Sequence, residues 1–207
     1  MDDRRCDSLM VLMGNLKLMK FRPTYILLEN VVGFETSSVH DAIILWVSTQ
    51  ECILSPLQFG IPNSRPRYYL MASTHFPVVG LAEDIADQFR PNSSSELKEI
   101  SEFLCEPSHT SSLYLDENVL QKYGCAIDVI LPSSTRSACF TKSYGSYISG
   151  CGSYICYRPD LVVNNHLNQS TLDDAQSLRD VVRRLSPREV ANLMCFPKTF
   201  EIPPELS

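Results

Sequence analysis

The sequence predicts an α/β fold. In its first 75 residues two helical patterns alternate with two apolar runs of strand length, and this order is typical of α/β proteins. The first run, residues 25–28, is apolar at every position, which is typical of a parallel strand covered on both faces. The chain has 207 residues, of which 44% are hydrophobic and 20% charged, so it can bury a sizeable core.

The first helix is predicted from the spacing of its apolar residues. Asp7 or Ser8 is a suitable N-cap. Leucine or methionine then recurs at positions 9, 12, 13 and 16, which is one face of a helix. Pro23 ends the helix, because proline cannot continue it. The strand over residues 25–28 follows directly.

The second helix and second strand are predicted further along the chain. Ser37 or Ser38 starts a helix that continues to Trp46. A loop that contains Pro56, Gly60 and Pro62 follows. Residues 67–72, which are apolar after Arg67, are then predicted to form the second strand.

The later part of the chain gives weaker patterns until its last helix. Short helices are expected near residues 96–104 and 116–123, and three glycines favour loops and a hairpin over residues 139–156. Ser186 and Glu189 form a capping box, with proline at the first helical position. The buried stripe of this last helix is expected to be Val190, Leu193 and Met194.

The formal net charge of −6 comes mainly from one segment. Residues 83–117 contain nine acidic and two basic side chains, which leaves +1 for the rest of the chain. Such a run is typically a solvated face. The acidic composition therefore does not exclude a nucleic-acid partner, because a basic cleft can form elsewhere.

The cysteine pattern excludes several classes of protein. The eight cysteines are scattered, with no C-x-x-C and no cysteine–histidine cluster at the spacing of zinc ligands. We therefore expect no metal site, and reduced thiols in a cytoplasmic or nuclear protein. No stretch approaches the roughly 20 apolar residues of a membrane helix. Acidic residues beside the N-terminal arginines argue against a secretory signal.

Polar side chains stand at the ends of the two predicted strands. Glu29 and Asn30 end the first strand, and ligands of an open parallel sheet gather at the carboxyl ends of its strands. Arg65 and Arg67 are two residues apart in an extended segment, so their side chains point the same way and form a fork for a carbonyl or phosphate oxygen. The alternatives are a glutamate that faces solvent or caps the next helix, and ordinary surface arginines.

Residues 139–147 combine Lys142 with hydroxyl groups, aromatic rings and glycine. That composition can bind a phosphate and stack an unpaired base, or it can form a buried hairpin with a structural thiol at Cys139. A second basic candidate, or else the solvated flank of a helix, consists of Arg179, Arg183, Arg184 and Arg188. The histidines, at positions 40, 75, 109 and 166, form no visible constellation.

Four segments, taken in order, resemble the cytosine-5 methyltransferase family. YILLENVVGFE resembles its Glu-Asn-Val strand, SPLQFGIPNSRPRYYLMA its Arg-x-Arg motif, and RRLSPREVANLMCFP the segment that closes its target-recognition region. CFTKSYGSYISGCGS resembles the branch that methylates aspartate tRNA and was historically named a DNA methyltransferase. The likeness covers most of the chain except the acidic segment.

The resemblance implies a partial Rossmann-like sheet of an S-adenosylmethionine-dependent methyltransferase, with a smaller target-recognition region. Residues 1–75 would be the partial catalytic domain. Residues 76–185 would be the acidic variable segment and the target-recognition region. Residues 186–207 would return towards the catalytic domain.

The resemblance also implies a mechanism. In this family a cysteine thiolate adds to C6 of a cytosine rotated out of its stack, and C5 then takes the methyl group of S-adenosylmethionine. By matching motif, Glu29 holds the base edge and Asn30 braces the strand end, while Arg65 and Arg67 bind near the base carbonyl and the neighbouring backbone. Recognition of tRNA, in its anticodon region, is assigned to Cys139, Phe140, Thr141, Lys142 and Tyr144. The expected protein is a monomer without membrane attachment, and DNA is the alternative substrate.

The chain departs from the family pattern in its catalytic parts. The family's nucleophile belongs to a Pro-Cys motif upstream of Glu-Asn-Val, where this chain has only Cys6, preceded by arginine. The glycine-rich cofactor loop is expected there too, where the chain has a lone Gly14. We therefore interpret the chain as a truncated or alternatively spliced member that does not methylate by itself. One alternative, from another class, is a non-catalytic RNA-binding or regulatory fragment. Another is a chain that does not fold stably.

Overall fold

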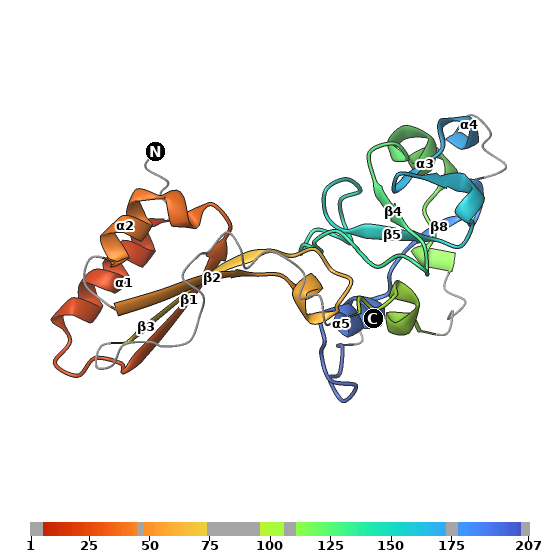
Figure 1. Cartoon of the computed structure of the whole chain (residues 1–207). Coiled ribbons are helices and arrows are strands. Elements are labelled where there is room, and N and C mark those ends of the chain that lie inside the picture. Colours follow the sequence, from red (N-terminus) through yellow and green to blue (C-terminus); the bar gives the residue numbers. More distant parts are fainter. Residues whose placement is uncertain (1–5, 45–47, 74–95, 106–110, 173–177, 204–207) are drawn as a thin grey trace. The chain divides into compact units, whose positions relative to one another are not determined.

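The computed structural model describes residues 6–44, 48–73, 96–105, 111–172 and 178–203, and the chain divides into two compact units (Figure 1). Unit 1 comprises Met1–Ser55 and Pro66–Arg90, and unit 2 comprises Pro56–Arg65 and Pro91–Ser207. The described residues form helices and small sheets in both units, which confirms the α/β class. The chain returns from unit 2 to unit 1 directly after Arg65, within the predicted arginine fork.

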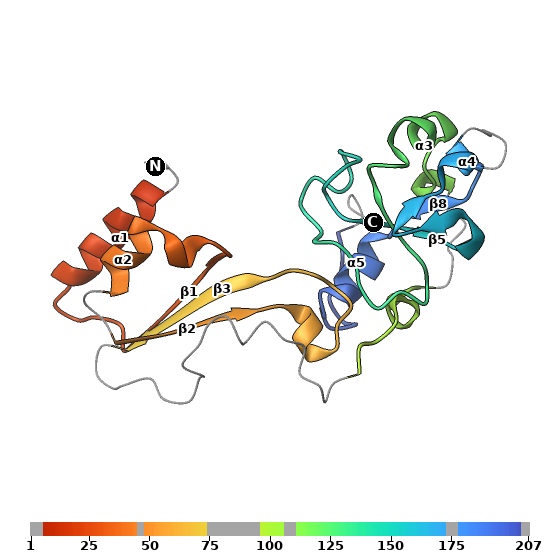
Figure 2. The same cartoon turned by 45° about the horizontal axis from the view of Figure 1, so that its top comes forward.

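Unit 1 is a three-stranded sheet with two helices on one face. β1 (Tyr25–Val31) and β2 (Ser48–Leu54) both pair antiparallel with the central β3 (Arg67–Ser73). α1 (Asp7–Leu18) and α2 (Ser38–Ile44) lie on the same side of this sheet (Figures 1 and 2). Their shared core consists of Met13, Phe34, Ile43, Ile53, Tyr68, Leu70 and Ala72. Both predicted helices are therefore present, although Trp46 lies outside the described residues.

The environment of β1 differs from the prediction of a parallel strand buried on both faces. β1 is antiparallel to β3, and its residues alternate between exposed and partly buried. Tyr25, Leu27 and Val31 are 70%, 68% and 57% exposed. The helices cover only the other face, and within the described residues β3 is the strand that pairs with β1. An apolar run fits either environment, and its composition did not distinguish them.

The predicted N-cap residue agrees with the structure for α2 but not for α1. The N-cap of α1 is Cys6, with no side-chain cap, rather than Asp7 or Ser8. In front of α2, the hydroxyl of Ser37 accepts a hydrogen bond of 3.2 Å from the backbone N–H of His40. Ser37 therefore caps the helix that starts at Ser38, as its hydroxyl chemistry favours.

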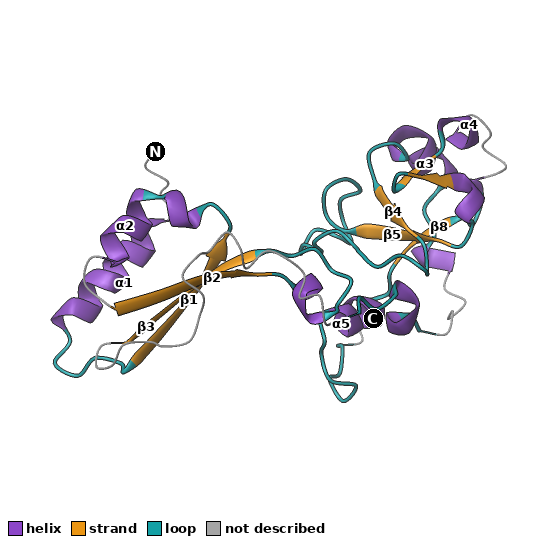
Figure 3. Ribbon diagram, viewed as in Figure 1, coloured by secondary structure: helices purple, strands orange, loops and turns teal. Residues whose placement is uncertain are grey.

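Unit 2 is built around a second three-stranded sheet. β5 (Ser153–Cys156) pairs parallel with β4 (Asp128–Ile130) and antiparallel with β8 (Val182–Arg184), and every residue of β5 is buried. β6 (Val162–Val163) and β7 (His166–Leu167) form a short hairpin. The helices are α3 (Glu117–Tyr123), α4 (Gln169–Leu172) and α5 (Pro187–Leu193). Figure 3 shows that loops and turns connect these short elements.

The later sequence predictions agree with unit 2 in part. α3 confirms the helix predicted over 116–123, with the Asp116 carboxylate accepting from the N–H of Asn118 at 2.8 Å. Only a 3-10 turn, Ile100–Phe103, forms where a helix was predicted over 96–104. The capping box of α5 is confirmed.

The described part of the acidic segment supports a solvated face. Glu96, Glu99, Glu102 and Asp116 are exposed there, and the remainder of this segment lies partly outside the described residues. No helix in the described ranges is long and apolar enough to cross a membrane. Among the same residues, no histidine, cysteine and carboxylate side chains gather as ligands for a metal ion.

Candidate functional site

Glu29 and Arg67 form an ion pair on the face of the unit 1 sheet that the helices leave uncovered. In the β1–β3 register Glu29 lies opposite Tyr69, so Arg67, two residues before Tyr69, is its diagonal neighbour on the same face. Arg67 Nε lies 3.1 Å from Glu29 Oε1, and the two side chains are 19% and 50% exposed. Arg67 Nη1 also donates to the carbonyl oxygen of Pro66 at 2.8 Å. The structure thus brings together two of the predicted site residues, with a carboxylate half open to solvent.

Asn30 lies on the opposite face of β1, across from Tyr68. Its side-chain oxygen accepts a hydrogen bond of 2.8 Å from the backbone N–H of Val31. Gly33 follows with φ of +99°, a value that favours glycine in the turn after the strand. Asn30 is therefore placed to stabilise the end of β1, directly after Glu29.

Arg65 contacts a different partner, within unit 2. Its Nη1 donates to Cys139 Sγ at 3.0 Å. The two segments are held together by the N–H of Ser64, which donates to the carbonyl of Ser137 at 2.8 Å, and by the Ser137 hydroxyl, which donates to the carbonyl of Pro62 at 2.7 Å. Arg65 and Cys139, 74 positions apart, are thus adjacent, whereas Arg65 and Arg67 do not share a partner as the predicted fork implied.

Part of the loop predicted to recognise tRNA lies in the hydrophobic core of unit 2. Phe140 and Tyr144 are 5% and 9% exposed and pack edge to face at 5.0 Å. The Tyr144 hydroxyl donates to the carbonyl of Ser153 at 2.6 Å and accepts from the N–H of Leu185 at 2.9 Å. Burial raises the pKa of Tyr144, so the hydroxyl stays protonated. These two rings match the buried-hairpin alternative.

The exposed part of this loop is smaller. Thr141 and Lys142 are exposed, and Cys139 is half-buried. Gly152 explains the tight packing below them, because a Cβ at that position would lie 2.6 Å from the Phe140 ring and 2.7 Å from the Tyr144 ring. Within residues 139–144, Thr141 and Lys142 are thus the side chains best placed to meet a ligand from solvent.

Arg183 has a structural environment that the sequence interpretation missed. It meets Glu189 through two hydrogen bonds of 2.8 and 2.9 Å, and the two side chains are 6% and 2% exposed. Burial opposes ionisation of Glu189, but the guanidinium and the backbone N–H groups of Ser186 and Cys105 outweigh it and lower the pKa of the carboxyl. The sequence does contain a signal for this ion pair, because the glutamate of the capping box follows an arginine by six residues. Arg183 therefore does not belong to a basic surface, whereas Arg179 is exposed.

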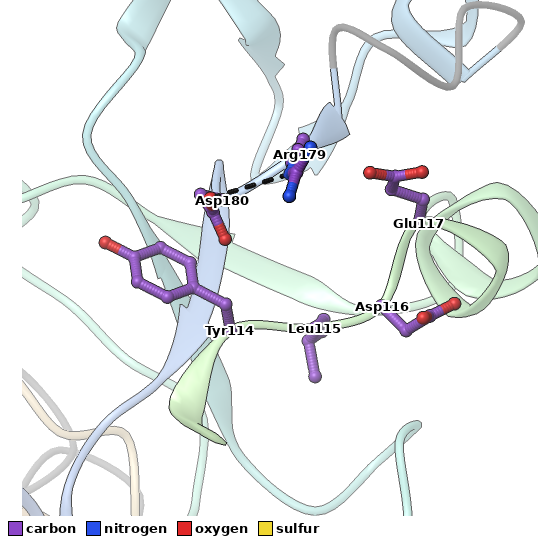
Figure 4. A pocket seen from close by; sticks show the side chains of 6 residues that line it. All are labelled: Tyr114, Leu115, Asp116, Glu117, Arg179 and Asp180. Carbon is purple, nitrogen blue, oxygen red and sulfur yellow. Dashed lines mark ion pairs between the residues drawn. The ribbon is translucent and has the colours of Figure 1, made fainter. Parts of the chain in front are cut away.

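A polar pocket of about 330 Å³ lies in unit 2 beside the start of α3 (Figure 4). Its lining residues are Tyr114, Leu115, Asp116, Glu117, Arg179 and Asp180. Arg179 and Asp180, which are neighbours in the chain, form a long, exposed ion pair of 4.0 Å, and Asp116 is engaged as the cap of α3. None of the predicted site residues lines this pocket.

Comparison with known proteins decides the family. The profile described as C-5 cytosine-specific DNA methylase matches residues 16–207. The chain belongs to this family. Glu29 and Arg67 both lie within the matched residues.

Several relatives carry more specific names. The chain is 32% identical to a tRNA (cytosine(38)-C(5))-methyltransferase of Schizosaccharomyces pombe, over 96% of this chain and 60% of that protein. It is 28% identical to the Homo sapiens protein of the same name, over 100% of this chain and 70% of that protein. A relative of Dictyostelium discoideum, 28% identical over 99% of this chain and 64% of its own length, is named DNA (cytosine-5)-methyltransferase.

Solved structures agree with these relatives. The crystal structure of Schizosaccharomyces pombe Dnmt2 methyltransferase aligns with a TM-score of 0.78 and 31% identity, over 98% of this chain and 62% of that one. The Spodoptera frugiperda DNMT2 mutant structure aligns with a TM-score of 0.75 and 29% identity, over 96% and 63%. The chain thus has the fold of part of these methyltransferases and spans under two thirds of their length.

The methyl donor of such methyltransferases is S-adenosylmethionine, and the described residues do not fit it well. A cofactor of this kind is held by a glycine-rich turn between a strand and a helix. Before β2 the described glycines are Gly14, inside α1, and Gly33, a single glycine after β1. Neither forms a glycine-rich cradle.

Proposed function

We propose that this chain forms the target-base side of a tRNA cytosine-5 methyltransferase. The observation that carries the proposal is the ion pair between Glu29 and Arg67, because it unites the two motif residues that the family resemblance assigns to the target cytosine. The relatives named tRNA (cytosine(38)-C(5))-methyltransferase support tRNA as the substrate and cytosine 38 as the target.

The pair offers a cytosine both kinds of polar partner. Cytosine presents an amino group, which donates, beside N3 and a carbonyl oxygen, which accept. The half-exposed Glu29 carboxylate accepts from the amino group and can share a proton with N3. The Arg67 guanidinium, held by Glu29 and by the carbonyl of Pro66, donates to the base carbonyl. Thr141 and Lys142, both exposed, would contact the tRNA from unit 2.

We infer that the 207 residues bind substrate without transferring a methyl group. Methyl transfer in this family requires a thiolate that attacks C6 of the base. No cysteine of this chain follows a proline. Cys139, which accepts a hydrogen bond from Arg65, follows an alanine rather than a proline.

A filter-binding titration with a tRNA transcript tests the proposal. Binding is expected to weaken steeply with salt, because phosphate contacts release counterions. Arg67→Met is expected to weaken binding by about tenfold, the size of a lost contact to a base edge. Arg158→Met is the matched control and should bind like the wild type, since Arg158 pairs with Asp160 at an exposed site.

Two outcomes of this titration would contradict the proposal. Tighter binding to duplex DNA than to tRNA would favour the activity named for the Dictyostelium discoideum relative. Equal losses for Arg67→Met and Arg158→Met would show that binding follows total charge rather than the Glu29–Arg67 pair.

A further inference from the structure

Unit 1 contains a cluster of titratable side chains that the proposed function does not use, although the sequence showed no constellation around its histidines. His40, in the first turn of α2, is 7% exposed. Its Nε2 lies 2.8 Å from Glu51 Oε2 on β2, and its Nδ1 lies 3.2 Å from Asp41 Oδ1. The hydroxyl of Tyr68, on β3, donates to the same Glu51 oxygen at 2.8 Å.

This geometry, with a carboxylate oxygen at each ring nitrogen of His40, favours the imidazolium form. An ionised carboxylate only accepts hydrogen bonds, and a neutral imidazole carries a single N–H. Only the imidazolium can therefore donate to Glu51 and Asp41 at once. Burial lowers the pKa of His40, but the hydrogen bonds and charges of Glu51 and Asp41 outweigh it, so the pKa lies above its ordinary value.

The groups that face the imidazole come from each element packed on it. They are Asp41 of α2, Glu51 of β2 and the hydroxyl of Tyr68 on β3, while the aromatic rings of Phe34 and Tyr68 have centroids 6.1 and 5.9 Å from the imidazole. Burial, Glu51 and the more distant Glu35 raise the pKa of Tyr68. Tyr68 thus remains a donor, and His40 is the residue of this cluster whose ordinary pKa lies closest to neutral pH.

The cluster is connected to the candidate base site through β3. Tyr68 directly follows Arg67 and points to the opposite face of the sheet, and it lies across from Asn30, the residue after Glu29. Glu51 joins Tyr68 to His40 by accepting from both on one oxygen. The start of β3, which presents Arg67, is therefore tied to α2 by way of β2.

We propose that His40 is a proton-dependent positioning residue, which as an imidazolium holds Glu51 and Tyr68 and so fixes the end of β3 that presents Arg67 to Glu29. Loss of the proton removes one of the two histidine hydrogen bonds and weakens this connection. An effect of His40 protonation on cytosine binding rests on the proposed function. An effect of His40 protonation on the position of Arg67 does not.

The direction of the pH dependence follows from the raised pKa. The folded chain binds the His40 proton more tightly than the unfolded chain, so the proton stabilises the fold. This stabilisation is complete below the unfolded pKa of about 6.5 and is lost as the pH rises through the folded pKa.

A nuclear magnetic resonance titration of the full chain tests the proposal without RNA. The imidazole signals of His40 should titrate with a midpoint above about 6.5. The Nε–H signal of Arg67 should shift with the same midpoint. Glu51→Gln should lower the His40 midpoint by about one pH unit, because it removes the partly buried negative charge but keeps an acceptor for Tyr68.

Two variants complete the test. His40→Gln should make the Arg67 signal independent of pH between 6 and 9, whereas His166→Gln, a change in unit 2, should leave its titration as in the wild type. A His40 midpoint at or below about 6.5, or an Arg67 signal that does not follow His40, would overturn the proposal. If His40→Gln does not fold, the proposal is still decided by the wild-type midpoints of His40 and Arg67 and by the shift of the His40 midpoint in Glu51→Gln. Failure to bind tRNA would contradict the proposed function alone.

Discussion

Arg183→Met is expected to lower the free energy of unfolding by about 3–5 kcal/mol. The substitution leaves the Glu189 carboxylate, which is 2% exposed, without the guanidinium that meets it through two hydrogen bonds. The backbone N–H groups of Ser186 and Cys105 would still donate to Glu189, but they do not neutralise a buried charge. Urea-induced unfolding, followed by circular dichroism, measures the loss.

Two further variants make this experiment specific to the buried charge. Arg158→Met breaks an ion pair whose partners are 58% and 57% exposed, so the loss of stability should be far smaller than for Arg183→Met. Adding Glu189→Gln to Arg183→Met removes the uncompensated charge and should recover part of the stability. A loss below about 1 kcal/mol for Arg183→Met would show that the pair does not stabilise unit 2.

No incorporation of labelled methyl groups into tRNA is expected from the 207-residue chain and S-adenosylmethionine. Attack of a thiolate on C6 makes C5 nucleophilic, and none of the eight cysteines stands in a Pro-Cys motif, so we expect the covalent route to be lost rather than slowed. Weak residual activity is therefore not the expected result. Scintillation counting of the recovered tRNA measures the incorporation.

The fission yeast relative named tRNA (cytosine(38)-C(5))-methyltransferase is the positive control for this assay. It should label the same transcript under the same conditions. Incorporation above background by the 207-residue chain would contradict the inference. If Cys139→Ala then abolished that signal, Cys139 would be the thiol.

The features that the sequence predicted correctly are those encoded within a few neighbouring residues. The capping box of Ser186 and Glu189, the helix over 116–123 and the helical spacing before Pro23 all depend on local geometry. Motif order also pointed to Glu29 and Arg67, whose side chains the β1–β3 register makes diagonal neighbours.

The features that the sequence did not reveal depend on pairings between distant residues. An apolar run such as Tyr25–Leu28 does not encode its partner strand, so its antiparallel pairing and exposed face were missed. The connection of His40 to Glu51 and Tyr68 joins residues 11 and 28 positions apart, with no spacing rule to indicate it. Tyr144 was assigned to tRNA recognition by the family resemblance, but its hydroxyl forms hydrogen bonds with backbone groups of the core.

The assignment of target-base binding to this chain is tested most directly by its affinity for two tRNA transcripts that differ only in cytosine or uridine at position 38. Uridine presents a carbonyl where the Glu29 carboxylate requires a donor. We predict that the wild type binds the cytosine transcript about tenfold more tightly. Glu29→Gln should abolish the preference, because an amide can both donate and accept. Equal affinity of the wild type for both transcripts would contradict the assignment.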